Sequence, residues 1–130
     1  MARVTLDDID VMCVVALGGP AGGPAAFAAL EAPLGSLRGR RFYGTYLTGE
    51  YRACVAIAPA DDPHAFGLQT WRIPGGLYER RRMVDWPNHL DEIERTLDEM
   101  AADSEHDTLR PSIEFYRSER ELILLQPVRG

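Results

Sequence analysis

Hydrophobic and polar positions along the chain follow patterns that predict several strands and two helices. The strand-like segments, rich in β-branched and aromatic residues or alternating in polarity, are residues 11–17, 41–47, 51–58, 111–117 and 121–128, with a longer one at 68–83 interrupted at 74–76. Short polar connections at 48–50 and 118–120 predict two β-hairpins. The stretches 60–67 and 103–107 are expected to be loops.

Helical spacing is found in two places. Residues 25–30 are apolar and follow Pro24, which suits a first helical turn, and Pro33 ends or bends this helix. A second helix is predicted where apolar residues recur at helical spacing and acidic residues occupy the other side, with Asp85 or Asn88 as the capping residue. The apolar positions of this helix are Leu90, Ile93, Leu97 and Met100.

The order strand, helix, hairpin occurs twice, at a spacing of about 60 residues, which indicates an internal duplication. We therefore expect an α+β fold in which residues 1–130 form a single domain of two tandem strand-helix-strand-strand modules, about 9–60 and 66–129, with mainly antiparallel sheets. Each helix would cover one sheet face. The other face would pack on the partner module or line a cleft between the modules.

Composition excludes several classes of protein. All 14 basic residues are arginine, 20 residues are acidic, and the net charge of -6 argues against direct nucleic-acid binding. The longest apolar run is too short to span a membrane, and acidic residues precede it, so we expect a cytoplasmic protein that is a monomer or a small homo-oligomer. Cys13 and Cys54 are expected to be reduced core residues, and the three histidines form no metal-ligand spacing. No metal or cofactor is predicted.

Alternation along the strand at 111–117 singles out one carboxylate. Ile113 and Phe115 share a face that we expect under the helix, so Glu114 would point into the space between the modules. A buried carboxylate needs a donor, a raised pKa, or a cavity for a cationic ligand. An arginine partner is the purely structural alternative. Alignment of the hairpins places Gly44 on Glu114 and Tyr46 on Tyr116, which leaves room beside the carboxylate.

Aromatic side chains near this position suggest a pocket wall. Tyr43, Tyr51 and Trp71 fit a cleft that accepts a flat or cationic apolar molecule, and core packing is the alternative for each of them.

Three segments carry a resemblance to a known family. They are RFYGTYLTGEYRACVAI, LQTWRIPGGLYERRRM and RPSIEFYRSERELILLQPV. Together they resemble the GyrI-like small-molecule-binding family, also known as the gyrase-inhibitor-like or AraC-type effector-binding domain. The resemblance implies a pseudo-two-fold axis between the modules and lipophilic, often cationic ligands in a cleft with a central glutamate. That role falls on Glu114, with Tyr46, Tyr43 and Trp71 as matching aromatic positions.

The resemblance also sets the functional expectation and its alternatives. Since no segment is left for a helix-turn-helix, we expect a stand-alone member that binds or sequesters hydrophobic, cationic or planar small molecules without catalysis. One alternative is a hydrolase that opens cyclopropane-type genotoxins, with Glu114 as general base and Tyr46 orienting the water. The other is a protein that interacts with a large partner such as gyrase.

Overall fold

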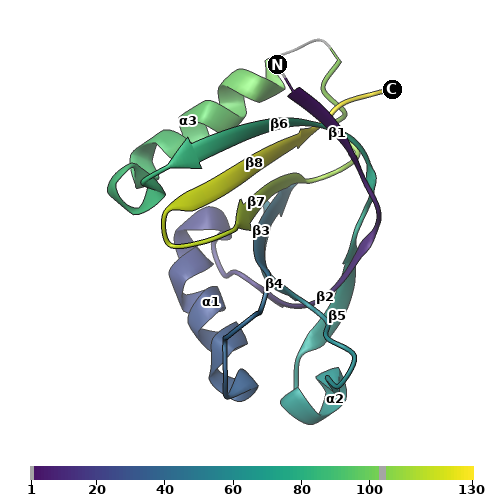
Figure 1. The fold of residues 1–130 in the computed structure, drawn as a ribbon, viewed down its shortest axis with the longest axis vertical. Helices are drawn as coiled ribbons and strands as arrows, with labels where there is room; N and C mark the ends of the chain where they lie inside the picture. Colours follow the sequence, from purple (N-terminus) through teal and green to yellow (C-terminus); the bar gives the residue numbers. More distant parts are fainter. Residues whose placement is uncertain (1, 103–104) are drawn as a thin grey trace.

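The architecture was determined from a computed structural model that describes residues 2–102 and 105–130. Its eight strands form one antiparallel sheet in the order β1-β6-β8-β7-β3-β4-β2-β5 (Figure 1). The strands are β1 (Ala2–Leu6), β2 (Ile9–Val15), β3 (Phe42–Leu47), β4 (Glu50–Ala56), β5 (Gln69–Ile73), β6 (Gly76–Val84), β7 (Ser112–Tyr116) and β8 (Glu121–Pro127). The helices are α1 (Gly23–Glu31), α2 (Pro63–Phe66) and α3 (Leu90–Ala101), and 3-10 turns lie at Gly19–Gly22, Ala32–Leu34 and Trp86–Asn88.

The predicted α+β class and the repeated element order are confirmed. β2-α1-β3-β4 forms the first strand-helix-strand-strand unit and β6-α3-β7-β8 the second. Each hairpin closes where the sequence indicated, the first through Thr48 and Gly49, whose positive φ angles of 50° and 82° suit a tight two-residue turn. The two units join edge to edge, because β3 pairs with β7.

Two long bent strands curl the sheet into a half-barrel. Residues 2–6 pair with 76–80, and residues 9–13 pair with 69–73 in the same register. The two paired segments, 2–13 and 69–80, therefore bend together. Gly75 lies in this bend and donates its backbone N–H to Asp8 Oδ1 at 2.6 Å. A Cβ on Gly75 would overlap the carbonyl of Leu6, which is why only glycine fits at this crossing.

The segment before the bend was missed in the sequence. The first strand was expected to begin at residue 11, whereas β1 already pairs with β6 from Ala2 onward. Its signal was the alternation of Arg3, Val4, Thr5 and Leu6, which is short but has the period of a strand.

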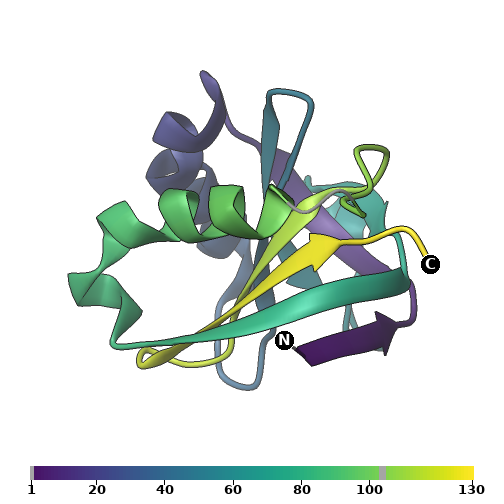
Figure 2. The same cartoon turned by 90° about the horizontal axis from the view of Figure 1, so that it is seen from above.

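The sheet is apolar on both faces, and this corrects one placement. Both α1 and α3 lie on the outer face of the sheet (Figure 2). Ile113 belongs to the cluster inside the curl, with Phe115 packed against it, so the expectation that this pair lies under a helix was wrong. Because a curled sheet must fill its own concave face with side chains, hydrophobicity alone does not say which face of a strand meets a helix.

Two local predictions also need correction. The loop expected at 60–67 contains the short helix α2, which starts where Asp62 accepts a hydrogen bond from the Ala65 N–H at 3.3 Å. Neither Asp85 nor Asn88 caps α3, because their side chains bond to each other at 2.9 Å across the 3-10 turn and His89 is the residue that precedes the helix. The loop expected at 103–107 includes Asp103 and Ser104, which lie outside the described residues.

Cys13 and Cys54 are buried and free, as expected for core residues. They face each other across β2 and β4, and burial raises the pKa of both thiols. Within the described ranges, the structure contains no helix with the length and apolar character needed to cross a membrane.

Candidate functional site

The centre of the sheet brings one residue from each module together. Gly44 on β3 pairs directly with Glu114 on β7. These two positions are also equivalent in the alignment of the two hairpins, so a pseudo-two-fold relation between the modules passes through this pair. The side chain of Glu114 projects from the outer face of the sheet, since Leu124, its neighbour on β8, belongs to the cluster under α3.

Two tyrosines hold the carboxylate of Glu114 through a single oxygen. The hydroxyl of Tyr51 donates to Oε1 at 2.8 Å and the hydroxyl of Tyr116 donates to the same atom at 2.6 Å. Among the described residues, none donates a hydrogen bond to Oε2 and no basic side chain forms an ion pair with Glu114. Within the described part of the chain, Glu114 therefore lacks the arginine partner considered as an alternative, and Oε2 is left to accept a further hydrogen bond.

Gly44 creates the space for this arrangement. A Cβ atom at Gly44 would overlap the hydroxyl of Tyr51 and would lie 2.7 Å from Glu114 Oε1. The absence of a side chain at this position is thus what allows the hydroxyl of Tyr51 to reach the carboxylate from the neighbouring strand.

The electrostatics of the site follow from burial among neutral partners. Desolvation raises the pKa of Glu114, and the hydrogen bonds from Tyr116 and Tyr51 offset only part of this shift. Burial, together with the charge of Glu114, also raises the pKa of both tyrosines. Both phenols therefore stay protonated and act as hydrogen-bond donors, while the carboxylate keeps an uncompensated negative charge when it is ionised.

Rings from both modules meet at Tyr116 on the outer face of the sheet. Phe27 of α1 contacts it edge-on with centroids 5.5 Å apart, and Trp86, in the turn before α3, contacts it at 5.1 Å. The indole of Trp86 is fixed by a hydrogen bond from Nε1 to the carbonyl of Ser118 at 2.9 Å. Tyr116 and Phe27 were absent from the residues expected at the site. Only Tyr116 had a usable signal, its alignment with Tyr46.

The structure brings only some of the expected residues together. Tyr51 contacts Glu114 directly, whereas Tyr46 lies on the same face of the sheet but is 41% exposed and makes no hydrogen bond to Glu114 among the described contacts. Tyr43 lies on the opposite face, inside the curl, where it stacks on Phe115 at 4.9 Å. We therefore do not place Tyr43 in the site around Glu114.

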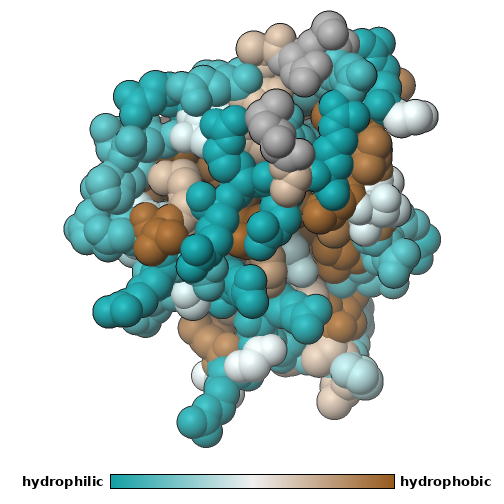
Figure 3. Space-filling view, turned by 45° about the horizontal axis from the view of Figure 1, so that its top comes forward, coloured by the Kyte–Doolittle hydropathy of each residue, from teal (hydrophilic) through white to brown (hydrophobic). Residues whose placement is uncertain are grey.

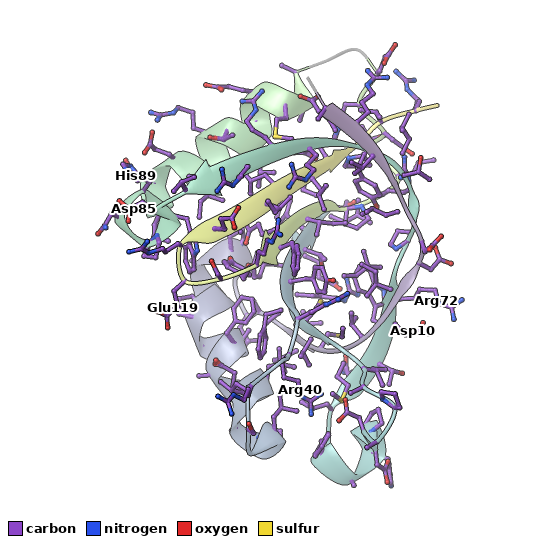
Figure 4. The ribbon with its side chains drawn as sticks, in the orientation of Figure 1. Asp10, Arg40, Arg72, Asp85, His89 and Glu119 are labelled. Atoms are coloured by element: carbon purple, nitrogen blue, oxygen red, sulfur yellow. The ribbon has the colours of Figure 1, made fainter. Side chains whose placement is uncertain are left out.

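Trp71 also lies away from Glu114. It is on the edge strand β5, with the guanidinium of Arg52 4.3 Å above its ring. It lines a separate hollow of about 670 Å³ at the edge where Asp10 and Arg72 form an exposed ion pair of 2.7 Å, seen together in Figure 4. Trp71 therefore belongs to a different surface from the two-tyrosine site.

The chemistry available at Glu114 is that of a half-buried anion with aromatic neighbours. Such a group can attract a desolvated cation, or can accept a proton from water once its own pKa lies nearer neutrality. Within residues 2–102 and 105–130, no group of three or more His, Cys, Asp or Glu side chains is placed to hold a metal ion.

Solved structures share this fold over its whole length. No protein-family model and no curated protein matches the sequence. An integron cassette protein from Vibrio cholerae is 14% identical, with a TM-score of 0.74 over 98% of this chain and 95% of that chain. The protein SAV2435 bound to tetraphenylphosphonium is 12% identical, with a TM-score of 0.65 over 99% and 93%. A hydrolase from Listeria innocua is 13% identical, with a TM-score of 0.61 over 98% and 91%.

These similarities establish a common architecture. At such low identity they show the fold alone, and the fold hosts both a protein solved with a lipophilic cation and a protein described as a hydrolase. The function of this chain has to be argued from the site itself.

Proposed function

We propose that this protein binds hydrophobic cations, with Glu114 as the counter-charge and the rings of Tyr116, Phe27 and Trp86 as the apolar surroundings. The observation that carries the proposal is the pattern of contacts at Glu114. Two neutral phenols satisfy Oε1, and no described basic group neutralises the carboxylate. Membership of the GyrI-like family, with residues about 9–60 and 66–129 as its duplicated modules, is part of this proposal.

The physical preference for a cation follows from the cost of burying charge. An ionised carboxylate in an apolar setting is destabilised unless an opposite charge arrives with its own hydration removed. A lipophilic cation loses little hydration on entry, and aromatic faces attract it further. Neutral molecules of the same shape gain only the apolar contact, and anions are repelled.

The structural neighbour solved with tetraphenylphosphonium supports this choice of ligand class. Tetraphenylphosphonium is therefore the first probe, and triphenylphosphine oxide serves as a neutral aromatic comparison. We expect calorimetry to detect binding of the cation to the wild-type protein, and about tenfold weaker binding to Glu114→Gln. Glu119→Gln, which removes an exposed carboxylate from the β7–β8 turn, is the matched control and should bind as the wild type does.

Two results would contradict the proposal. One is equal affinity of the wild type and Glu114→Gln for the cation. The other is binding of triphenylphosphine oxide as tight as binding of tetraphenylphosphonium, because the charge would then contribute nothing.

Hydrolysis of an electrophilic small molecule is a second candidate function. It is favoured by the raised pKa of Glu114, since a carboxylate nearer neutrality is a better general base, and by the free Oε2. Tyr51 and Tyr116 hold Oε1, so the site supports them rather than Tyr46 as positioning residues. Ring opening of a cyclopropane-bearing alkylator, followed by mass spectrometry, tests this function. Turnover that persists undiminished in Glu114→Gln would exclude Glu114 as the base.

The third expectation, interaction with a protein such as gyrase, receives no support from the described contacts of the site. A supercoiling assay distinguishes it from ligand binding, because inhibition through a protein surface should survive the substitution Glu114→Gln.

A further inference from the structure

The concave side of the sheet holds another hollow, and its charged residues are basic, in contrast to the acidic site around Glu114. It has a volume of about 270 Å³ and is lined by apolar side chains that include Val4 of β1, Phe115 of β7, and Ile123 and Leu125 of β8. Among the described residues, the charged ones that line it are Arg80 and Arg117. On the face seen in Figure 3, hydrophobic surface shows in patches between hydrophilic side chains. The hollow thus has apolar walls and two guanidinium groups.

Register places this hollow on the face opposite to Glu114. Arg80 pairs with Leu125, and Phe115 pairs with Ile123, so these side chains all project into the curl. Neighbouring Arg81, by contrast, projects outward toward α3, where it pairs with Glu99 at 3.4 Å. Arg80 and Arg81 therefore project from opposite faces of β6, and the guanidinium of Arg80 lies on the concave side.

Positive charge is in excess around the hollow. The nearby carboxylate of Glu121 accepts a hydrogen bond from Arg82 and lies 4.0 Å from Arg117. The hydrogen bond from Arg82, aided by the charges of Arg117 and Arg80, holds the pKa of Glu121 below its ordinary value. One carboxylate thus pairs with both Arg82 and Arg117, while Arg80 acts on it only through its charge. Arg80, which is half-buried, forms no hydrogen bond or ion pair with any described residue.

From this combination we propose that the hollow is a binding site for a small amphipathic carboxylate, whose anionic head is held by Arg80 and Arg117 and whose apolar tail packs against Phe115, Ile123 and Leu125. A guanidinium matches a carboxylate through paired hydrogen bonds, and the apolar lining excludes fully polar anions from the tail position. The volume lies just below that of pockets for drug-sized molecules, which favours a short aliphatic acid.

This site is separate from the proposed cation site in face, charge and residues. The chain carries a net charge of -6, so anions are not attracted to it in general. Binding of a carboxylate therefore has to depend on the local arginines, and this dependence makes the proposal testable independently of Glu114.

Methyl NMR with octanoate tests the proposal, with octanol and octylammonium as the neutral and cationic molecules of equal chain length. We expect octanoate to shift the methyl signals of Ile123, Leu125 and Val4, and to leave those of Ile93 and Leu97 under α3 unchanged. Octanol should bind at least about tenfold more weakly at these methyls, since it lacks the charge-assisted hydrogen bonds.

Variants of Arg80 identify the charge responsible. Arg80→Gln should weaken octanoate binding by about tenfold, and Arg80→Lys, which keeps the charge, should retain most of the affinity. Arg95→Gln is the control, because Arg95 lies on α3 and pairs with Glu92. Unshifted methyls of Ile123 and Leu125, equal binding of octanol and octanoate, or wild-type affinity in Arg80→Gln would each overturn the proposal. Octanoate binding is expected to be the same in Glu114→Gln as in the wild type, whether or not this variant binds tetraphenylphosphonium.

Discussion

The two modules have the same order of elements, but one equivalent row of side chains across their strands is apolar in the first module and polar in the second. In the first module, the row two residues before Gly44 consists of Phe42, Val55 and Met12, which pack under α1. In the second, the row two residues before Glu114 consists of Ser112, Gln126 and Glu79.

The polar row is held by directed bonds. The hydroxyl of Ser112 donates to Gln126 Oε1 at 2.7 Å, and Gln126 Nε2 donates to the carbonyl of Leu97 on α3 at 2.9 Å. Glu79 is only 2% exposed, and its Oε1 accepts no hydrogen bond from the described residues, with Arg81 3.9 Å away. Among the described contacts, the first module holds its helix through apolar packing, whereas the second also bonds to a helix carbonyl and contains a buried carboxylate, which is costly.

The largest loss of stability is expected when a residue of the apolar row is replaced by glutamate, the residue at the equivalent position of the polar row. Met12→Glu would place a carboxylate at a fully buried position in the apolar cluster under α1, beside Val55 of β4. We expect a loss of about 4 kcal/mol or more in the free energy of unfolding, measured by urea denaturation. Asp10→Glu, at an exposed position of the same strand, should change it by less than about 0.5 kcal/mol. Stability of Met12→Glu within about 1 kcal/mol of the wild type would show that the rows are interchangeable.

Adding a methyl group at the junction of the modules should have the next largest effect. Gly44→Ala removes the space for the hydrogen bond from Tyr51 to Glu114, so we expect a loss of about 3 kcal/mol in stability together with weaker tetraphenylphosphonium binding. The control is Gly23→Ala, whose Cβ would lie 3.4 Å from the ring of Tyr51, at ordinary contact distance. Equal effects of both substitutions would contradict the role assigned to Gly44.

The reverse substitution, of Glu79 in the polar row by methionine, the residue at the equivalent position of the apolar row, should stabilise the protein. Glu79→Met replaces a buried carboxylate that lacks a close donor, and we expect the free energy of unfolding to rise by about 2 kcal/mol. Glu119→Met, at an exposed turn position, should leave it unchanged. A loss of stability in Glu79→Met would mean that the carboxylate anchors its surroundings more strongly than its contacts indicate.

The smallest effect concerns the pH dependence contributed by Glu114. Because its pKa is raised in the folded state, the folded protein binds this proton more tightly than the unfolded chain does, and stability falls as pH rises through the raised pKa. Glu114→Gln lacks this titration. We expect the variant to match the wild type near pH 4 and to exceed it by about 1 kcal/mol at pH 7 in urea denaturation. A variant less stable than the wild type at pH 7 would contradict this sign.

The same titration should govern ligand binding in the opposite direction. Affinity for tetraphenylphosphonium should fall as pH is lowered through the raised pKa of Glu114, because protonation removes the counter-charge. Affinity that is constant between pH 4 and pH 8 would show that the carboxylate does not contact the cation.

Local patterns in the sequence determined the elements and their order. The apolar spacing of α3, the Thr48–Gly49 turn and the repeated strand-helix-hairpin order depend on residues close to one another in the chain, and each of these is seen in the structure. The prediction that Gly44 lies beside Glu114 also held, because equivalent residues of antiparallel central strands meet at a two-fold axis.

Only the tertiary structure decided which face each strand presents and which rings meet at Glu114. The alternation along β7 separated Glu114 from Ile113 and Phe115. Because both faces of the curled sheet carry apolar clusters, the alternation did not say which face meets a helix. Tyr43 therefore lies inside the curl, and Trp86 reaches Tyr116 from the turn before α3. A sequence records the period of a strand, whereas the closure of a sheet and the approach of a helix depend on contacts between residues far apart along the chain.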